Sequence, residues 1–518
     1  MKQSDSLFSQ LKYDLPASLV VFLVALPLCL GIALASKAPL FSGIIAGVAG
    51  GLVVAAISKS PLSVSGPAAG LTVIVANGIE TMGSFQAFLL AVVLAGIFQM
   101  LLGAVRAGVI GYYFPSAVIK GMLAAIGLIL ILKQIPHALG YDKDAEGDEA
   151  FVQLDGENTF SELVNAIFNP SPGAAVIAAA ALLVLILWER PFMKRQSFTR
   201  LVPGALIAVL GGTGINLLFG LLMPAWQLAG DHLVSLPLAG ETLGQLAFPD
   251  WSAFARKDLY IVAATLAIVA SLETLLSVEA ADKLDPYKRN TPTNRELLAQ
   301  GAGNLLSGLV GGLPLTAVIV RSSANVYAGA RTRLSALLHG IWLLLSVLLI
   351  PAVLNLIPLA ALASILLMTG YKLAKISLFK SMYQAGWSQF LPFAITVGAI
   401  LFTDLLIGIL IGMGVAVFFI LRNQYHNPYF YRQEPHHAGD RIVIELSQEV
   451  SFINKASVML MLSELPDRTK VTVDGSRTVN IDPDVVEILE DFRETAKMKE
   501  IDYELVNIKP GAPVEYGH

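Results

Sequence analysis

The sequence is poor in charged residues. Among its 518 residues only 14% are Asp, Glu, Lys or Arg, whereas 55% are hydrophobic and the mean hydropathy is +0.67. Globular proteins in water carry roughly a quarter charged residues, so this composition excludes an ordinary soluble protein. The apolar residues also gather into many runs of about 20 residues, the length that crosses a hydrocarbon layer of about 30 Å. The chain is therefore predicted to be an α-helical polytopic membrane protein.

Cysteine and positive charge are also scarce, and both exclude classes of function. The single cysteine, Cys29, excludes a disulfide framework and a cysteine-based zinc site. A formal charge of −4 excludes a nucleic-acid binder that relies on general basicity. The sequence contains no phosphate-binding loop, no HExxH zinc motif and no GxSxG nucleophile motif. We therefore expect no enzyme activity, no bound metal, no cofactor and no nucleic-acid partner.

The apolar runs between Pro16 and Leu421 predict about fourteen membrane segments. They are expected at 17–36, 40–57, 65–80, 85–105, 109–132, 173–188, 201–223, 259–280, 296–312, 318–328, 333–350, 353–371, 386–402 and 404–421. The third and the tenth segments are too short, or too interrupted by Gly, Pro and Ser, to be complete spans. Broken helices are tolerated at membrane depth only where they are buried in protein or line a cavity. These two segments therefore point to the interior of the protein.

Basic residues set the predicted orientation. With a cytoplasmic N-terminus, the cytoplasmic loops carry most of the Lys and Arg residues, and the opposite loops are poor in them. This distribution follows the positive-inside rule. It predicts a multi-pass protein of a bacterial inner membrane, with both termini in the cytoplasm. The expected domains are a cytoplasmic N-terminus at 1–16, a transmembrane domain at 17–422, a linker at 423–438 and a soluble domain at 439–518.

The composition changes after Arg422 to a charged sequence with alternating strand-like and helix-like periods. The runs "RIVIEL", "KVTVDG" and "DYELVNI" are typical of strands, and the runs "NKASVMLMLSEL" and "DPDVVEILEDFRETAKM" are typical of amphipathic helices. This pattern predicts a small α/β domain at the C-terminal end.

Two Gly-rich segments resemble each other and form a faint internal repeat. Pro61 aligns with Pro314, and each is followed by Leu and then by a hydroxyl residue, Ser63 or Thr316. In the predicted topology the two copies run in opposite directions, as expected of an inverted repeat. The alternative is a chance similarity between two apolar stretches.

Such a pair of segments has a specific electrostatic consequence. Two half-helices whose N-termini meet inside the membrane present unpaired N–H groups and two positive dipole ends to an anion. The run from Ser63 to Gly70 supplies hydroxyls and a glycine that lets the backbone approach the ligand, and Pro67 fits the first turn of a helix, where no N–H is needed. The segments predict a site for a small anion. The alternative is a Pro/Gly kink that only packs.

Three ionisable residues stand out inside the predicted spans: Glu273, Arg321 and Lys120. Charge within a membrane is costly and is usually paired or functional. Arg321 lies near the start of the tenth segment, where its guanidinium could add a fixed positive charge to the anion site. Glu273 is its expected partner, and proton uptake by Glu273 would couple transport to protons; the alternative is a fixed tie between helices. Lys120 is expected to extend to the cytoplasmic face.

These segments resemble the sulfate permease (SulP) family of anion transporters. The resemblance covers nearly the whole chain and rests on "VALPLCLGIALASKAP", "SGPAA", "LETLLSVEAADK" and "RSSANVYAGARTR". It implies two inverted seven-segment repeats that form a core and a gate domain, followed by a cytoplasmic STAS domain, which the tail resembles in a short form. It also implies a substrate cavity between the first, third, eighth and tenth segments.

The resemblance assigns residues to that cavity by position. The implied substrate-binding residues are Pro27, Cys29, Ser65, Gly66, Pro67, Ala68, Ala69, Val320, Arg321 and Ser322, and the implied coupling residues are Glu273 and Ser277.

The sequence departs from family patterns in two places. The sodium-dependent bicarbonate branch has small or hydroxyl residues where this chain has Ile319, Val320 and Arg321, so the resemblance favours protons over sodium as the coupling ion. STAS proteins that switch by phosphorylation have a serine after an Ile-Asp turn, whereas here Asp482 is followed by Pro483. The tail is therefore expected to act in dimerisation or docking, with nucleotide binding as the alternative, and a homodimer is expected.

The expected function is secondary active transport of a small inorganic anion, bicarbonate or sulfate, by proton symport or anion exchange. The alternatives are a sodium-dependent bicarbonate symporter, an anion channel, a dicarboxylate transporter, a nucleobase:cation symporter and a regulatory membrane anchor. A channel would need the cavity but no coupling residue, and an anchor would need no charges within its spans.

Overall fold

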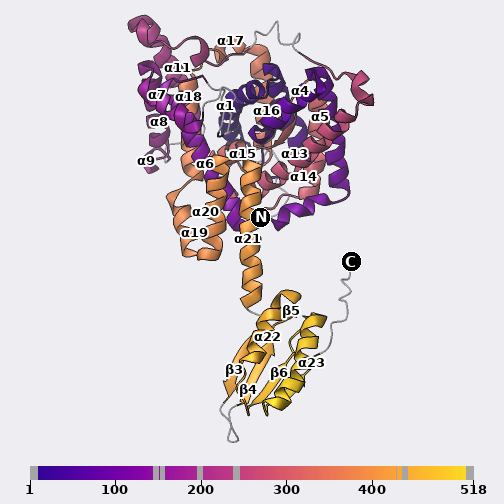
Figure 1. Cartoon of the computed structure of the whole chain (residues 1–518). Coiled ribbons are helices and arrows are strands. Elements are labelled where there is room, and N and C mark those ends of the chain that lie inside the picture. The colour runs from indigo at the N-terminus through magenta and orange to yellow at the C-terminus, as the bar shows by residue number, and fades with distance from the viewer. Residues whose placement is uncertain are drawn as a thin grey trace. The chain divides into compact units, whose positions relative to one another are not determined.

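The computed structural model describes residues 10–143, 151, 158–194, 202–236, 246–426, 429–434 and 441–508. The expected N-terminal segment 1–16 and linker 423–438 therefore lie partly outside the described residues. The chain forms two compact units, Met1–Met413 and Gly414–His518. The first unit is helical and the second is α/β, and each is described by itself (Figure 1).

The helical unit begins with long helices that are interrupted by one short strand. Its first half contains α1 (Leu11–Ala35), α2 (Leu40–Ala49), a π-helical turn (Gly50–Val54), α3 (Ala55–Ile57), β1 (Ser65–Pro67), a 3₁₀ turn (Ala69–Leu71), α4 (Thr72–Met82), α5 (Phe85–Ala104), α6 (Ser116–Leu139), α7 (Thr159–Phe168), α8 (Pro172–Trp188), α9 (Pro191–Lys194) and α11 (Gly204–Leu222).

The second half repeats this pattern of helices around one short strand. It contains α13 (Lys257–Leu284), α14 (Thr293–Leu309), β2 (Leu315–Ala317), α15 (Ile319–Tyr327), α16 (Leu334–Leu349), α17 (Pro351–Leu354), α18 (Leu359–Leu373), α19 (Ile376–Gln384), α20 (Trp387–Phe402) and α21 (Leu405–His426), whose last turns belong to the second unit.

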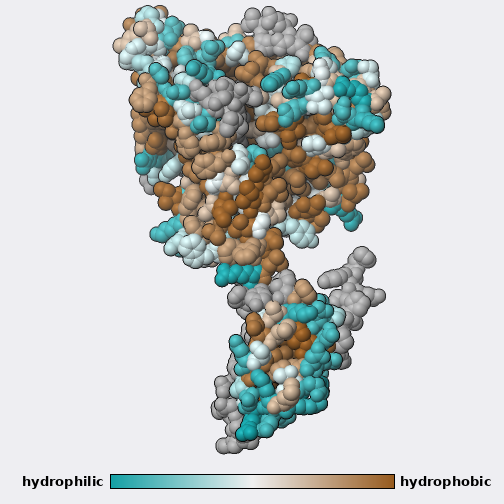
Figure 2. Space-filling model, in the orientation of Figure 1, coloured by the Kyte–Doolittle hydropathy of each residue, from teal (hydrophilic) through white to brown (hydrophobic). Residues whose placement is uncertain are grey.

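The helices confirm a multi-pass membrane protein. In the part of the chain that the structure describes, eight helices are long and apolar enough to cross a membrane, or up to nine if α7 and α8, which meet at 107°, form one span. Shorter apolar helices cover Ala69–Met82, Leu334–Leu349 and Trp387–Phe402. Figure 2 shows apolar side chains spread over the flank of the helical unit, as lipid contact requires. The number fourteen stays a prediction.

The helices of the first unit pack in two groups. One group contains α1, α2, α4, α5, α13, α14, α15 and α16, and the other contains α6, α7, α8, α11, α18, α19 and α20. Each group takes helices from both halves of the unit, and the two groups meet along α1, α13 and α15 of the first group. This division agrees with a core domain and a gate domain, and we use these names for the two groups.

The C-terminal unit is an α/β domain, as the sequence predicts. Its sheet has the order β3 (Tyr429–Glu434), β4 (Arg441–Leu446), β6 (Lys470–Asp474), β8 (Asp502–Val506), with β4, β6 and β8 parallel and β3 antiparallel. The helices are α22 (Lys455–Ser463) and α23 (Pro483–Met498), and β5 (Glu449–Val450) pairs with β7 (Asn480–Ile481).

The core of this unit follows the period of its strands. Alternate residues of β4 and β6, among them Ile444 and Val473, are fully buried against Leu489 of α23. At the turn without an acceptor serine, the Asp482 carboxylate accepts a hydrogen bond of 3.0 Å from the Asp484 backbone N–H and so caps α23.

Candidate functional site

The two short strands, β1 and β2, meet inside the helical unit, and we call their pair the strand crossing. β1 and β2 pair antiparallel, with Gly66 opposite Thr316. The Val318 N–H donates to the Val64 carbonyl at 2.9 Å, and the Val64 N–H donates to Ser322 Oγ at 3.0 Å. Because a short helix follows each strand, the N-terminal ends of both helices start from this crossing. The geometry agrees with the two half-helices that the repeat predicts.

Arg321 is the charged residue at the crossing. It is the third residue of α15 and its side chain has no exposed surface. Its Nη2 donates to Cys29 Sγ of α1 at 3.3 Å, whereas its Nε and Nη1 have no hydrogen-bond partner among the residues that the structure describes. A thiol is a weak acceptor, and a buried charge without compensation is costly. The arrangement therefore suits an anion that would accept hydrogen bonds from Arg321.

Gly66 makes room for the guanidinium. A Cβ atom at Gly66 would lie 2.1 Å from Arg321 Nη1, so any other residue would displace the charged group. Gly47 of α2 makes room for Cys29 in the same way, because a Cβ atom at Gly47 would lie 2.7 Å from Cys29 Sγ. The sequence suggested that a glycine lets backbone approach the ligand. The structure shows that this glycine first lets the arginine approach the strand.

Glu273 lies beside the same segment, four residues further along. It belongs to α13, has 6% of its surface exposed, and its Oε1 would lie 3.0 Å from a Cβ atom at Gly70. One residue later, Thr274 Oγ1 accepts from the Ala317 N–H of β2 at 3.3 Å. Glu273 and Arg321 therefore lie against one short stretch of chain. The hydrogen bond that the structure shows for Arg321 goes to Cys29, and the predicted pairing with Glu273 stays a prediction.

The predicted site residues form one closed cluster. All of them except Ala69 are buried, namely Pro27, Cys29, Ser65, Gly66, Pro67, Ala68, Glu273, Ser277, Val320, Arg321 and Ser322. Ser322 both accepts from Val64 and donates to the Val318 carbonyl at 2.8 Å, so its hydroxyl holds the strand crossing together. These residues are therefore largely shielded from solvent in this structure.

A polar ladder on α14 supports the crossing, and sequence reasoning missed it. Glu296, Gln300, Asn304 and Ser307 lie on one face of the helix and have at most 1% of their surface exposed. Gln300 Nε2 donates to Ser65 Oγ at 2.7 Å and to Glu296 Oε1 at 2.9 Å. Asn304 accepts from the Leu315 N–H at 2.7 Å and donates to the Leu315 carbonyl at 2.9 Å. The spacing of four residues in "RELLAQGAGNLLSG" was the available signal.

Two cavities lie at opposite ends of α1. One, of about 1010 Å³, is lined by Pro27, Leu30 and Leu34 together with the loops around Asp142 and His232. The other, of about 330 Å³, is lined by Lys12 and other residues of the first turns of α1, and by the end of α15, with α8, α11 and α18 facing them. Both cavities are bounded by core and gate helices. Pro27 borders the larger cavity, and Cys29, two residues further along α1, contacts Arg321.

The comparisons with known proteins address the same region of the chain. The family model described as "Sulfate permease family" matches residues 11–396, which include every predicted site residue. The chain belongs to the sulfate permease family.

Its relatives in the sulfate permease family carry transporter names. The chain is 27% identical to the putative sulfate transporter YvdB of Bacillus subtilis over 82% of this chain and 76% of the relative. It is 28% identical to the bicarbonate transporter BicA of Picosynechococcus over 79% of this chain and 69% of the relative. These relatives are transporters, which points to a protein that is not an enzyme.

Solved structures agree with the fold. The transmembrane domain of a cyanobacterial BicA matches 79% of this chain and 98% of that chain, with 26% identity and a TM-score of 0.52. The murine anion transporter Slc26a9 in its inward-facing state matches 98% of this chain and 87% of that chain, with 15% identity and a TM-score of 0.66. This second likeness concerns the fold alone.

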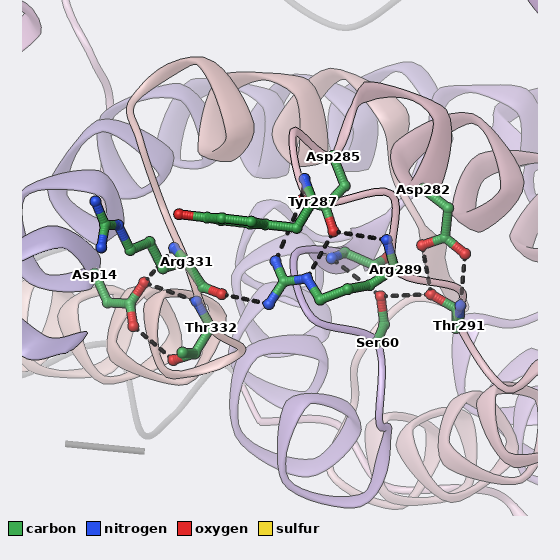
Figure 3. A network of polar contacts seen from close by, with 10 residues as sticks. Asp14, Ser60, Asp282, Asp285, Tyr287, Arg289, Thr291, Arg331 and Thr332 are labelled. Atoms are coloured by element: carbon green, nitrogen blue, oxygen red, sulfur yellow. Dashed lines mark hydrogen bonds and ion pairs between the residues drawn. The ribbon is translucent and has the colours of Figure 1, made fainter. Parts of the chain in front are cut away.

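Part of the sulfate permease signature has a structural role here. Arg331 and Thr332 of "AGARTR" donate backbone N–H groups to Asp14 at 2.7 and 3.0 Å, and the Arg331 carbonyl accepts from Arg289 Nη1 at 2.8 Å (Figure 3). Arg289 in turn pairs with Asp285 at 2.7 Å. This network joins the start of α1 to the loops after α13 and before α16. It fastens core helices to one another and lies apart from Arg321.

No metal centre accompanies the site in the described part of the chain. Among those residues, no group of three or more His, Cys, Asp or Glu side chains could hold a metal ion.

Proposed function

We propose that the protein is a secondary active transporter of small inorganic anions, of the bicarbonate or sulfate class, which works by alternating access. The observation that carries this proposal is the fully buried Arg321, whose Nε and Nη1 find no hydrogen-bond partner in the described part of the chain. The transporter names of its relatives support the same class of substrate.

The site chemistry favours an oxyanion. A guanidinium offers planar donors that match two oxygens of a carboxylate-like or sulfate-like group. The N-terminal ends of α4 and α15 add positive dipole ends from the strand crossing. Both elements recognise charge and oxygen geometry rather than one specific compound. For this reason bicarbonate and sulfate both remain in the proposal, with dicarboxylates as a further candidate.

The proposed coupling residue is Glu273, with a proton as the coupling ion. Its carboxyl is buried beside Gly70, on the same stretch of chain that Arg321 contacts at Gly66. An anion that binds Arg321 adds negative charge near Glu273, and a proton on Glu273 removes part of that repulsion. Ser277, one turn further along α13, is the second proposed member of the coupling site. Sodium is the alternative coupling ion.

The proposal extends to the surroundings of the chain. The protein would lie in a bacterial inner membrane as a homodimer with both termini in the cytoplasm. The C-terminal α/β unit would be a short STAS-like domain that serves dimerisation or docking.

Uptake into proteoliposomes tests the proposal. Purified full-length protein is reconstituted, and uptake of labelled bicarbonate and labelled sulfate is measured with an inward proton gradient, an inward sodium gradient or neither. Accumulation of one anion that is driven only by protons is the expected result. Accumulation that needs a sodium gradient would show that sodium, not a proton, is the coupling ion. Fast uptake that never exceeds equilibrium, without counter-anion exchange, would indicate a channel.

Two variants connect the uptake to the site. Arg321→Ala removes the buried charge, and we expect uptake to fall by about 100-fold or more, since loss of one partner of a buried charge pair costs about 3–5 kcal/mol. Arg190→Ala, at an exposed arginine, is the matched control and should leave uptake unchanged. Glu273→Gln should abolish the pH dependence of uptake. Normal uptake by Arg321→Ala, or an unaltered pH profile of Glu273→Gln, would leave these residues with structural roles.

A further inference from the structure

A third cavity of the helical unit shares Tyr327 and Lys372 with the smaller cavity at the start of α1, but none of the buried site residues lines it. Its volume is about 720 Å³, and it lies where the C-terminal end of α13 faces the start of α6, the end of α18 and the start of α19. Five lysines line it: Lys120 of α6, Lys283 of α13, Lys288 of the loop after α13, Lys372 of α18 and Lys375 just before α19.

The cavity has more positive charge than its own carboxylates can balance. Only Glu279 and Asp282 line it as acids. Glu279 pairs with Lys283 at 3.3 Å, and Asp282 accepts from the N–H and Oγ1 of Thr291 at 2.6 and 2.7 Å. Both carboxylates therefore already have partners at the wall of the cavity.

Two of the lysines have neither an acidic partner nor a side-chain hydrogen bond among the residues that the structure describes. Lys372 pairs with Glu189, and Lys288 Nζ donates to the Lys283 carbonyl at 2.5 Å. Lys120 and Lys375 form no ion pair with any residue that the structure describes. Lys375 Nζ lies 5.9 Å from the centroid of the Tyr327 ring. This contact attracts the ammonium group but does not neutralise its charge.

We propose that this cavity binds a phosphate-bearing anion that bridges the core and gate domains. Lys283 and Lys288 belong to the core side, and Lys120 and Lys375 belong to the gate side. A phosphate group carries up to two negative charges and several acceptor oxygens, which matches two unpaired ammonium groups and the Ser377 hydroxyl at the wall. The phosphate can come from a lipid headgroup or from a free phosphate compound.

The bridge has a consequence for transport. In alternating access the core moves against the gate, so an anion that contacts lysines of both domains holds their distance fixed. A bound phosphate therefore lowers the maximal rate of anion uptake and leaves the KM for the transported anion unchanged. This consequence rests on the proposed function, whereas binding of the phosphate does not.

Binding is measured first, on the detergent-solubilised full-length chain, by titration calorimetry. The probes are pyrophosphate for a free phosphate compound, and short-chain phosphatidic acid, with short-chain phosphatidylcholine as the reference, for a lipid headgroup. We expect Lys120→Gln combined with Lys375→Gln to weaken binding by about tenfold or more. Lys257→Gln combined with Lys380→Gln removes two exposed lysines that do not line the cavity and should change affinity by less than about twofold.

The outcomes separate this site from the transport site. Binding that persists in Arg321→Ala and is lost in the Lys120/Lys375 double variant supports the proposal, and the probe that binds identifies the source of the phosphate. Binding that is lost in Arg321→Ala, that is equal in the double variant and the wild type, or that neither probe shows would overturn it.

Transport is measured second, in proteoliposomes with pyrophosphate on both sides of the membrane. A lower maximal rate with an unchanged KM, absent in the double variant, supports the bridge. A maximal rate that bound pyrophosphate does not alter would overturn it. If neither the wild type nor any variant transports bicarbonate or sulfate, the proposed function fails while the binding result stands.

Discussion

At the scale of single residues, two glycines determine where the charges of the site lie. Gly66 and Gly70 are one helical turn apart in sequence, and Arg321 Nη1 lies over the first while the Glu273 carboxyl lies over the second. A side chain at either position would occupy the space of a charged group. The glycines of "SVSGPAAG" therefore act through the side chains that they admit, in addition to their backbone freedom.

The first prediction concerns Gly66→Ala. The added Cβ would lie 2.1 Å from Arg321 Nη1 and would push the guanidinium away from the strand crossing. Overpacking in a filled interior costs about 1–3 kcal/mol, and we expect the KM for the transported anion to rise about tenfold. Uptake kinetics in proteoliposomes measure this change. Gly398→Ala is the control, because a Cβ at Gly398 meets nothing within 4 Å; equal kinetics for both variants would contradict the packing argument.

A second residue-scale feature borders the larger cavity. The Asp142 carboxylate accepts hydrogen bonds from His137 Nδ1 at 2.7 Å and from His232 Nδ1 at 2.6 Å. Although burial on its own opposes the charge of Asp142, the hydrogen bonds from the two histidines hold the pKa of Asp142 below its usual value. The hydrogen bond to Asp142, partly opposed by burial, raises the pKa of His232.

These shifts predict how stability depends on pH. The raised pKa of His232 stabilises the fold fully below the unfolded value of 6.5, and this contribution is lost as the pH rises through the higher folded value. The lowered pKa of Asp142 stabilises the fold above 3.8 and is lost as the pH falls through the lower folded value. The contact is therefore strongest between these limits, at about pH 4 to 6.5.

The measurement is the Tm of the full-length protein between about pH 6 and 8.5, a range that spans the ordinary pKa of histidine. The wild type should lose Tm as His232 gives up its proton, and His232→Gln should show a flatter profile. Asp231→Asn is the control, because Asp231 contributes the smallest of the influences on His232 and makes no hydrogen bond to it. A profile of His232→Gln that parallels the wild type would show that the contact with Asp142 adds nothing.

At the scale of elements, α14 is a membrane helix with a polar face turned inward. Its ladder residues hydrogen-bond both strands of the crossing: Gln300 holds Ser65 of β1 and Asn304 holds Leu315 of β2. The three-residue pairing of β1 with β2 would be marginal alone, since isolated two-stranded pairs are barely stable. The position of both half-helices therefore depends on α14.

The third prediction concerns Asn304→Ala. The variant leaves the buried Leu315 N–H and carbonyl and the Gln99 amide oxygen without their partner. An unsatisfied buried group costs about 1–3 kcal/mol, so we expect about 3 kcal/mol or more of lost stability, seen as a lower Tm and weaker anion uptake. Asn77→Ala, at an exposed position of α4, is the control. A Tm equal to that of the control would show that α14 does not hold β2.

Most of the elements could be predicted from hydropathy, because long apolar runs have one stable solution in lipid. The segment expected at 109–132 is displaced to α6 at Ser116–Leu139, since residues 107–113 form a 3₁₀ turn and Pro115 disfavours helical backbone in the residue before it. The short α7 and α19 and the strands β3, β5 and β7 were missed. A summed hydropathy also treats α14 as an ordinary span and hides its buried polar face.

The sequence predicted which residues belong to the site, but it did not predict which residues they contact. Arg321, Glu273 and the strand segment stand out because charge and Pro/Gly pairs are rare in apolar runs. The partner of Arg321 is Cys29, 292 residues away in sequence, and Val64 binds Ser322 across 258 residues. One sequence has no signal for such pairs, since they depend on how distant helices pack.

At the scale of the molecule, α1 runs from the smaller cavity to the larger one and passes the buried Cys29. Lys12 lines the smaller cavity and Leu34 the larger one. At 1.5 Å per residue they lie about 33 Å apart along the helix, enough to reach opposite sides of a hydrocarbon layer. Cys29, without exposed surface, lies between them. The arrangement predicts that each cavity opens toward its own side of the membrane.

The fourth prediction uses cysteine labelling. In a Cys29→Ser background, which has no other cysteine, Lys12→Cys and Leu34→Cys should each react with a membrane-impermeant maleimide. Since the two positions lie at opposite ends of one spanning helix, reaction is expected from opposite sides in right-side-out and inside-out vesicles. Labelling of both positions from one side would contradict a spanning α1 with a cavity at each end.

The native Cys29 then separates a transporter from a channel. In an alternating-access protein the site opens to one side at a time, so Cys29 of the wild type should react slowly, at a rate that the transported anion alters, because the anion redistributes the protein between its states. A channel keeps a continuous aqueous path past the same residue. Rapid reaction of Cys29 from both sides, unaffected by bicarbonate or sulfate, would therefore favour a channel. Slow labelling that depends on the anion would support a core that carries Arg321 and Glu273 past the gate.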